Sequence, residues 1–142
     1  MDSIDRKILQ LLQENGRITV KEITQTISLT APAVSERIKR IEKEGIITGY
    51  TAIVDPGKLG RRIHAIINVS VQPVDTETLL ELVQNEDMVV ECHHVTGSYS
   101  YLVKVDAGEI NDLENLIVKF QKMGATNTQI ILSTPIPRKP VL

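Results

Sequence analysis

The first third of the chain repeats apolar residues at intervals of three and four, which is the spacing of one buried helix face. Short polar connections separate three such stretches, and we expect helices at 2–15, 20–27 and 30–44. These apolar residues indicate the buried side of each helix: Ile4, Ile8, Leu11, Leu12, Ile23, Ile27, Leu29, Val34, Ile38 and Ile41. Two short helices joined by a tight turn over 20–40 predict a helix-turn-helix packed against the first helix.

Residues that start and stop helices support these limits. Asp2 or Ser3 can cap the first helix, and Gly16 follows it as a natural stop. Thr30 can cap the third helix through its hydroxyl, and Pro32 suits the first turn, where a missing N–H costs little. Gly45 is expected to end that helix.

The outward face of the third helix carries small, polar and mostly basic side chains, which suit a surface that enters a DNA groove. Three residues are candidates for backbone phosphate contacts: Thr30, Arg37 and Arg40. Five others lie near the helix start, where base edges would be read: Pro32, Ala33, Ser35, Glu36 and Lys39. Short side chains among them predict modest sequence selectivity. The alternative for Arg37 is an intramolecular ion pair with Glu14, Glu22 or another acid.

The second half of the chain has a different pattern. The segment 46–54 is rich in β-prone residues and resembles the strand that follows many helix-turn-helix motifs as a wing. The turn-rich 55–60 marks a domain boundary. Beyond it we expect strands at 63–71, 88–96, 99–105 and 126–134, and helices at 76–84 and 109–123. The helix residues expected to face inward are Leu79, Leu80, Val83, Ile110, Leu113, Leu116, Ile117 and Phe120.

This order, β-α-β-β-α-β, is that of a ferredoxin-like unit. The sequence therefore predicts an α+β protein with a winged helix-turn-helix domain and a C-terminal ferredoxin-like domain for effector binding and assembly. The predicted boundaries are 1–54 for the first domain, 55–62 for a linker, 63–134 for the second domain and 135–142 for a tail.

The strand at 63–71 is apolar at most positions, so both of its sides are expected to be covered. Two helices can cover only one face of the sheet. A second copy of the same sheet is the simplest cover for the other face, which predicts at least a dimer. The alternative is that the head or the linker covers this face within one chain.

Composition narrows the class of protein. A net charge of −2 and a pI near 5.9 are not those of a general nucleic-acid binder. Residues 1–60 carry +1 and residues 61–142 carry −3, which fits a DNA-binding head on an acidic body. An aromatic content of 3% disfavours stacking on single-stranded bases. One cysteine, no apolar run long enough for a bilayer and no signal-peptide core predict a cytoplasmic protein. As a DNA-binding protein it would be associated with the nucleoid.

Candidate chemistry is sparse. Cys92, His93 and His94 are adjacent, but strand alternation places Cys92 and His94 on one face and His93 on the other. They do not make a four-ligand set, and we expect no metal site. One of these histidines is expected to face a dimer or effector pocket. Fingerprints of catalysis and of nucleotide binding do not occur, which predicts that the protein is not an enzyme.

Several motifs together resemble the Lrp/AsnC, or feast/famine, family of transcriptional regulators. They are D-x-x-D-x-x-I-L from Asp2, N-G-R from Asn15, E-R-I-K-R-I-E-K-E-G-I-I from Glu36, G-Y-T-A from Gly49 and V-T-G-S-Y-S-Y-L-V-K-V from Val95. The resemblance implies a homo-oligomer of dimers that gather into octamers around which DNA wraps. It also implies an amino-acid effector and regulation of amino-acid metabolism genes.

The resemblance implies that the effector is bound by the segment Val95, Thr96, Gly97, Ser98, Tyr99 and Ser100. Family members commonly carry acids where this chain has Ser98 and Ser100, and the acids help to hold the ammonium group of the ligand. Serine lacks that charge. The chain also has Ser28 where many members have a glycine with positive φ, and we expect Ser28 to cost about 1 kcal/mol there.

Three functions follow from these features. The first is an amino-acid-responsive regulator that binds double-stranded DNA with a sequence preference. The second is an architectural protein that wraps or bends DNA without an obligatory effector, which the two serines favour. The third, from another class, is a ferredoxin-like small-molecule-binding or enzymatic protein whose head serves assembly only.

Overall fold

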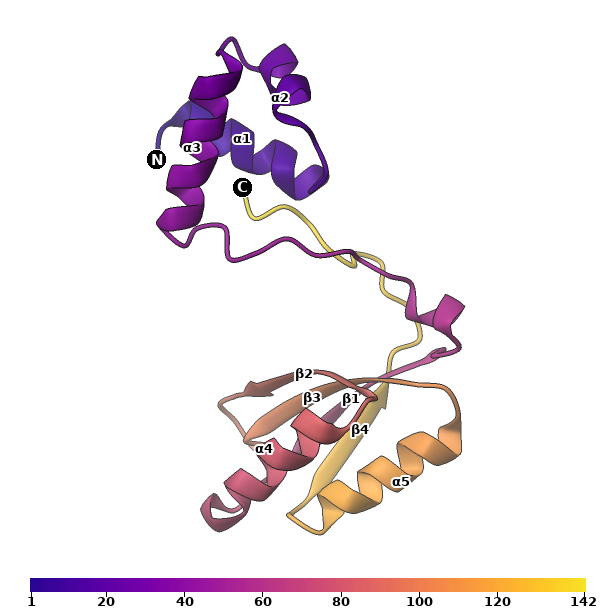
Figure 1. Ribbon diagram of the computed structural model, residues 1–142. Coiled ribbons are helices and arrows are strands. Elements are labelled where there is room, and N and C mark those ends of the chain that lie inside the picture. Colours follow the sequence, from indigo (N-terminus) through magenta and orange to yellow (C-terminus); the bar gives the residue numbers. More distant parts are fainter. The chain divides into compact units, whose positions relative to one another are not determined.

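The computed structural model describes all 142 residues, and the chain divides into two compact units (Figure 1). Unit 1 comprises Met1–Ile53 together with Ile136–Leu142. Unit 2 comprises Val54–Pro135. The last seven residues thus belong to the same unit as the first helix, although the whole of unit 2 separates them in sequence.

Unit 1 contains the three expected helices, α1 (Ser3–Glu14), α2 (Val20–Thr26) and α3 (Ala31–Lys43). The apolar positions that the spacing selected meet in one core. Its fully buried members are Ile8, Ile23, Ile27 and Val34, and the partly buried residues packed against them are Ile4, Leu11, Leu12, Ile18, Val20, Leu29 and Ile38. Ile41 is buried as well. The prediction of the inward faces is therefore confirmed.

The helix ends follow the expected capping chemistry with one exception. Thr30 caps α3, and Gly45 ends it in the left-handed region at φ +71°. At that end the Ile46 N–H donates to the Ile41 carbonyl at 3.1 Å. Gly16 does not cap α1, because the helix already ends at Glu14 and the extended Asn15 at φ −144° turns the chain away.

The expected strand in 46–54 does not form. A strand needs a neighbouring backbone, and β-prone residues without one remain irregular. A side chain fixes this segment instead, since the Tyr50 hydroxyl donates to Glu42 Oε1 at 2.9 Å. Burial and the Glu42 carboxylate raise the pKa of Tyr50 to about 12. The tail is also held to unit 1, where the Val141 N–H donates to Gln13 Oε1 at 2.8 Å.

Unit 2 is a four-stranded antiparallel sheet with two helices on one face, as Figure 1 shows. The elements in chain order are β1 (Ile63–Val69), α4 (Thr76–Asn85), β2 (Val89–His94), β3 (Tyr101–Ala107), α5 (Ile110–Gln121) and β4 (Thr126–Ile130). Short 3-10 turns at Pro56–Leu59 and Pro73–Asp75 precede β1 and α4. The spatial order β2-β3-β1-β4 is that of the predicted ferredoxin-like unit.

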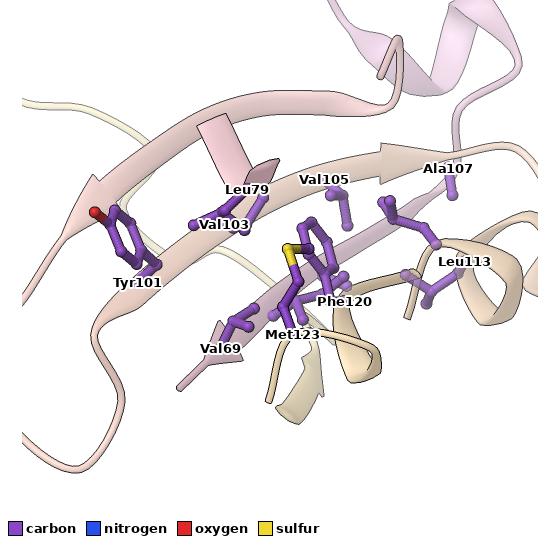
Figure 2. Packing of buried hydrophobic residues seen from close by; sticks show 12 residues of the cluster. Val69, Leu79, Tyr101, Val103, Val105, Ala107, Leu113, Phe120 and Met123 are labelled. Carbon is purple, nitrogen blue, oxygen red and sulfur yellow. The ribbon is translucent and has the colours of Figure 1, made fainter. Parts of the chain in front are cut away.

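Alternate residues of the central strands and the inner faces of both helices form the core of unit 2. Figure 2 shows Phe120 and Met123 together near Val105, and Leu113 further along α5 toward Ala107. Two of the helix residues expected to face inward are exposed instead.

Those two residues are Leu80 and Ile110, which are 43% and 54% exposed. Leu80 lies about 100° around the helix from the buried Leu79, so only one of the two can face the sheet. Ile110 is the first residue of α5. The helix thus reaches the sheet only from Leu113 onward.

The last strand is shorter than the predicted 126–134. One further ladder bond follows Ile130, in which the Ile131 N–H donates to the His64 carbonyl at 2.8 Å. Because β1 starts at Ile63, no partner strand exists beyond that point, and Leu132 is 95% exposed.

Gly124, in the turn between α5 and β4, touches the end of β1. A Cβ atom at this position would lie 1.7 Å from the carbonyl oxygen of Ser70. The approach is fixed because the Ser70 N–H donates to the Ala125 carbonyl at 2.9 Å. Any side chain must therefore push the turn away from the sheet.

We expect Gly124→Ala to lower the free energy of unfolding by about 2 kcal/mol or more, because backbone atoms cannot move aside cheaply. Thermal unfolding followed by circular dichroism measures this effect. Gly49→Ala is the control, since nothing lies within 4 Å of a Cβ there. Equal melting temperatures for the two variants would contradict the prediction.

Candidate nucleic-acid interface

Helix α3 owes its start to Thr30, which has extended backbone and accepts the Ala33 N–H on its hydroxyl at 3.4 Å. Pro32 occupies the first turn, where its missing N–H leaves no helix bond unmade. Both residues were expected to contact DNA, and both are exposed at the N-terminal end of the helix. This end carries the positive pole of the helix dipole, although Pro32 has no N–H and the Ala33 N–H is already bonded to Thr30.

The turn between α2 and α3 is tight and unstrained. The Leu29 N–H donates to the Ile27 carbonyl at 2.7 Å, and Leu29 itself packs against the core. Only glycines have positive φ in this chain, so Ser28 does not carry the expected cost. The turn closes through neighbouring extended residues and needs no left-handed residue.

Six residues of α3 line a shallow surface groove of about 510 Å³: Ala33, Glu36, Arg37, Lys39, Arg40 and Lys43. Four of these side chains are cationic and one is a carboxylate. Lys39 and Lys43 are exposed and make no ion pair within the chain, so their ammonium groups are available to a ligand. A groove with excess positive charge suits the phosphate backbone of a nucleic acid.

The two arginines are held by the start of α1. Arg37 Nη1 lies 2.7 Å from both Asp2 Oδ2 and Asp5 Oδ1, and Arg40 Nη2 lies 2.8 Å from Asp5 Oδ2. Of the alternatives for Arg37, the ion pair with another acid is therefore the one observed. Glu22 is engaged elsewhere, because it closes a capping box with Thr19 at the start of α2.

The charges in this cluster stabilise one another. The Asp5 backbone N–H, together with Arg37, lowers the pKa of Asp2 to about 2. Burial works to raise the pKa of Asp5, but the Asp2 N–H and the arginines outweigh it, so that pKa is also lowered. The two carboxylates in turn raise the pKa of Arg37. Asp2 and Asp5 are therefore ionised and Arg37 is protonated at neutral pH.

The structure thus places the eight candidate DNA contacts on α3 and its cap. They differ in solvent exposure and in whether they already form ion pairs within the chain. Glu36 and Lys39 are exposed, whereas Ala33 and Ser35 are half-buried. Lys43 was not among the candidates, although its position one helical turn after Lys39 could have indicated it.

The predicted effector segment, Val95 to Ser100, is the loop between β2 and β3 in unit 2. The Val95 N–H donates to the Ser100 carbonyl at 2.8 Å, and Gly97 turns the loop at φ +111°. Ser100 Oγ accepts the Val71 N–H at 2.9 Å and donates to the Val69 carbonyl at 3.3 Å. Its hydroxyl therefore ties the loop to the end of β1, while Ser98 is exposed.

The cysteine and histidines of β2 separate as alternation predicted. Cys92 and His94 pair with Val103 and Tyr101 on the helix side of the sheet, and the His94 and Tyr101 rings stack at 4.9 Å. His93 lies on the other face beside Glu91. The chain holds no group of three or more His, Cys, Asp or Glu side chains arranged for a metal ion. Its helices are also too short or too polar to cross a membrane.

A helix-turn-helix head with a basic reading helix, followed by a ferredoxin-like domain, defines a DNA-binding regulator with a second domain for ligands. Sequence comparison agrees with this class for both units. Residues 1–48 match the family described as winged helix-turn-helix DNA-binding, and residues 64–141 match the Lrp/AsnC ligand-binding domain. The chain belongs to the Lrp/AsnC family of transcriptional regulators, as its motifs suggested.

Related proteins align over almost the whole chain. The regulator LrpB of Bacillus subtilis is 38% identical over 94% of this chain and 88% of its own length. LrpC of the same organism is 31% identical over 94% of this chain and 92% of its own length. A solved structure of LrpC superposes with a TM-score of 0.90 at 30% identity, covering 97% of this chain and 99% of that one.

A second solved structure contains an amino acid. It is a transcriptional regulator of Neisseria meningitidis in complex with L-methionine. It superposes with a TM-score of 0.92 at 25% identity, covering 100% of this chain and 96% of that one. The DNA-binding regulator assignment therefore rests on fold, site and relatives together.

Proposed function

We propose that this regulator reads double-stranded DNA through the outward face of α3, with a sequence preference, and that an amino acid bound in unit 2 modulates it. The observation that carries the DNA proposal is the groove of α3, where Lys39 and Lys43 are free cations among four basic side chains. The relatives are transcriptional regulators, which supports this proposal over an enzymatic role. A DNA-binding protein of this kind would act at the nucleoid, in the cytoplasm.

Within α3 we propose two kinds of contact. Arg40 and the N-terminal end at Thr30 would bind phosphates, because charge and backbone N–H groups carry no base preference. Lys39, Glu36 and Ser35 would lie along base edges together with Pro32 and Ala33. Few long side chains are available for bidentate base contacts, so selectivity would depend partly on DNA shape.

We expect the chain to bind a promoter duplex that carries its preferred site, with an affinity that falls as salt rises from about 50 to 200 mM. Lys39→Ala should weaken binding to this duplex more than to a random duplex. Arg40→Ala should weaken both equally and make the salt slope shallower by about 1. Fluorescence anisotropy titrations at several salt concentrations measure these quantities.

Lys122→Ala is the matched control, because it removes one exposed positive charge from unit 2. It should leave both the affinity and the slope unchanged. Salt-independent behaviour of the wild type, or equal losses for all three variants, would refute the assignment of α3 as the reading helix.

The effector is proposed to bind at the loop from Val95 to Ser100, which the family resemblance of that segment implies. That an amino acid is bound at all is supported by regulators of this fold that are complexed with L-methionine. The loop carries no carboxylate, and the Ser100 hydroxyl is already hydrogen-bonded to the backbone at the end of β1. An ammonium group would therefore find only neutral partners here, which are weaker than a charge-assisted bond. The same observation favours the architectural alternative, in which DNA is wrapped without an effector.

A thermal-shift screen of the twenty amino acids at millimolar concentration separates these alternatives. Ligand at ten times its Kd should stabilise the protein by about 1.4 kcal/mol. Ser98→Asp should strengthen the response to the same amino acid by restoring a carboxylate at an exposed position, and Ser98→Ala should not. If no amino acid stabilises either the wild type or Ser98→Asp, the architectural role is favoured.

We also propose that a second copy covers the sheet face opposite α4 and α5. Ile66 and Leu102 lie on that face, since their pairing partners Lys104 and Asn68 alternate with the buried positions. The polar groups there already have partners: Asp106 Oδ1 lies 2.6 Å from His64 Nδ1, and Lys104 Nζ lies 3.2 Å from Glu91 Oε1. Covering this face would bury apolar side chains without leaving a charge unpaired.

Light scattering should give a mass of twice the chain mass of 15.8 kDa, or a higher even multiple such as an octamer. Leu102→Asp should reduce that mass by opening the sheet face. Leu80→Asp is the control, because Leu80 is equally apolar but lies on α4. A wild-type mass equal to one chain would overturn the proposal.

A further inference from the structure

The most constrained polar cluster of unit 1 lies where α1 meets the reading helix. It comprises Asp2, Asp5, Arg37 and Arg40. We propose that Asp5 is a positioning residue for DNA binding, whose buried carboxylate holds Arg40 so that its remaining N–H groups are presented to a phosphate. This inference rests on the proposed function of α3.

Asp5 is the one charged side chain that is buried, at 1% exposure. Both of its oxygens are used: Oδ1 accepts from Arg37, and Oδ2 accepts from Arg40 and from the Asp2 N–H at 3.0 Å. A buried carboxylate is costly unless it is fully paired, and an apolar pair could join two helices with less loss. The capping box of α1 needs only the bond from the Asp2 N–H, so the two bonds to the arginines point to a further task.

The two arginines have different roles at this carboxylate. Arg37 points one nitrogen, Nη1, at both aspartates, and its side chain is only 24% exposed. Arg40 gives only Nη2 to Asp5, and its side chain is 50% exposed. A guanidinium has five N–H donors in a rigid plane, so Arg40 can bond Asp5 and a phosphate together. Arg37 in contrast serves as an anchor between the helices.

Fixing Arg40 before DNA arrives removes the entropy that a free, rotamer-rich side chain would lose on binding. The competing interpretation is that Asp5 and Asp2 merely lie near the interface and repel phosphates. The two interpretations predict opposite changes in DNA affinity. Removing the carboxylate should weaken DNA binding if it positions Arg40, and strengthen binding if it only repels DNA.

The test is Asp5→Asn in the full chain, with the affinity for a promoter duplex measured by anisotropy. We expect a loss of about tenfold although the variant gains one unit of positive charge. Glu44→Gln is the matched control, because Glu44 is an exposed carboxylate 4.0 Å from Nε of the same arginine. It should bind at least as tightly as wild type. A tighter Asp5→Asn variant would overturn the inference.

A double-mutant cycle separates positioning from a general structural role. If Asp5 acts through Arg40, then Asp5→Asn should cause no further loss in an Arg40→Ala background. A full tenfold loss in that background would overturn the inference, because it would show an effect that does not pass through Arg40. The wild-type titration in the same series tests the proposed function by itself, since a chain that binds no duplex fails before any variant is compared.

A second variant covers the case in which Asp5→Asn does not fold. Asp2 is half-exposed, contacts Arg37 but not Arg40, and accepts the Asp5 N–H at 2.8 Å. Asp2→Asn should loosen Asp5 and bind DNA less tightly than wild type, with a smaller loss than Asp5→Asn. An affinity above wild type would show that the carboxylates only repel DNA and would overturn the inference.

Discussion

One buried carboxylate connects the start of the chain to its reading helix. Asp5 takes part in the capping box that starts α1, where its Oδ2 accepts the Asp2 N–H. The same carboxylate accepts Arg37 on Oδ1 and Arg40 on Oδ2, from a helix more than thirty residues further on. Helix initiation and helix packing are therefore coupled in a single group. Because such a carboxylate is stable only with all its partners in place, the orientation of α3 on α1 is held to a narrow range.

This coupling limits how strongly one head can bind DNA. Two of the four cations in the groove of α3 are engaged by aspartates, and only Lys39 and Lys43 are wholly free. Few phosphate contacts give modest affinity and a shallow salt dependence. Several heads held together by unit 2 would raise the effective affinity without any new contact. If the proposed assembly forms, the number of copies would matter as much as the chemistry of α3.

In the loop proposed for the effector, as in α3, part of the polar groups is already bonded within the fold. Ser100 closes it onto β1, and at the same end of that strand Gly124 approaches Ser70. A residue that serves the fold in this way has little bonding capacity left for a ligand. Of the two serines, only Ser98 is exposed and keeps its hydroxyl available, so it is the one that could contact the proposed effector.

Much of this architecture was predictable from local patterns in the sequence. Helical spacing identified the core of the head, Thr30 and Gly45 marked the ends of α3, and the order β-α-β-β-α-β identified the sheet domain. Local patterns gave the wrong prediction where the structure of a segment depends on a residue or strand that is distant in sequence. The segment 46–54 forms no strand because no backbone lies beside it, and β4 stops where β1 begins. Leu80 and Ile110 are apolar, but helix geometry turns them away from the sheet.

In the candidate site, too, some features follow from the sequence alone and others only from the tertiary structure. The sequence by itself determined that α3 would carry a basic outward face, because residue type and helical period suffice for that. Only the tertiary structure decided that Arg37 and Arg40 are bound to Asp2 and Asp5, since an ion pair depends on which helix lies opposite and no spacing along the chain records it. The free cations of the interface are consequently fewer than its basic residues.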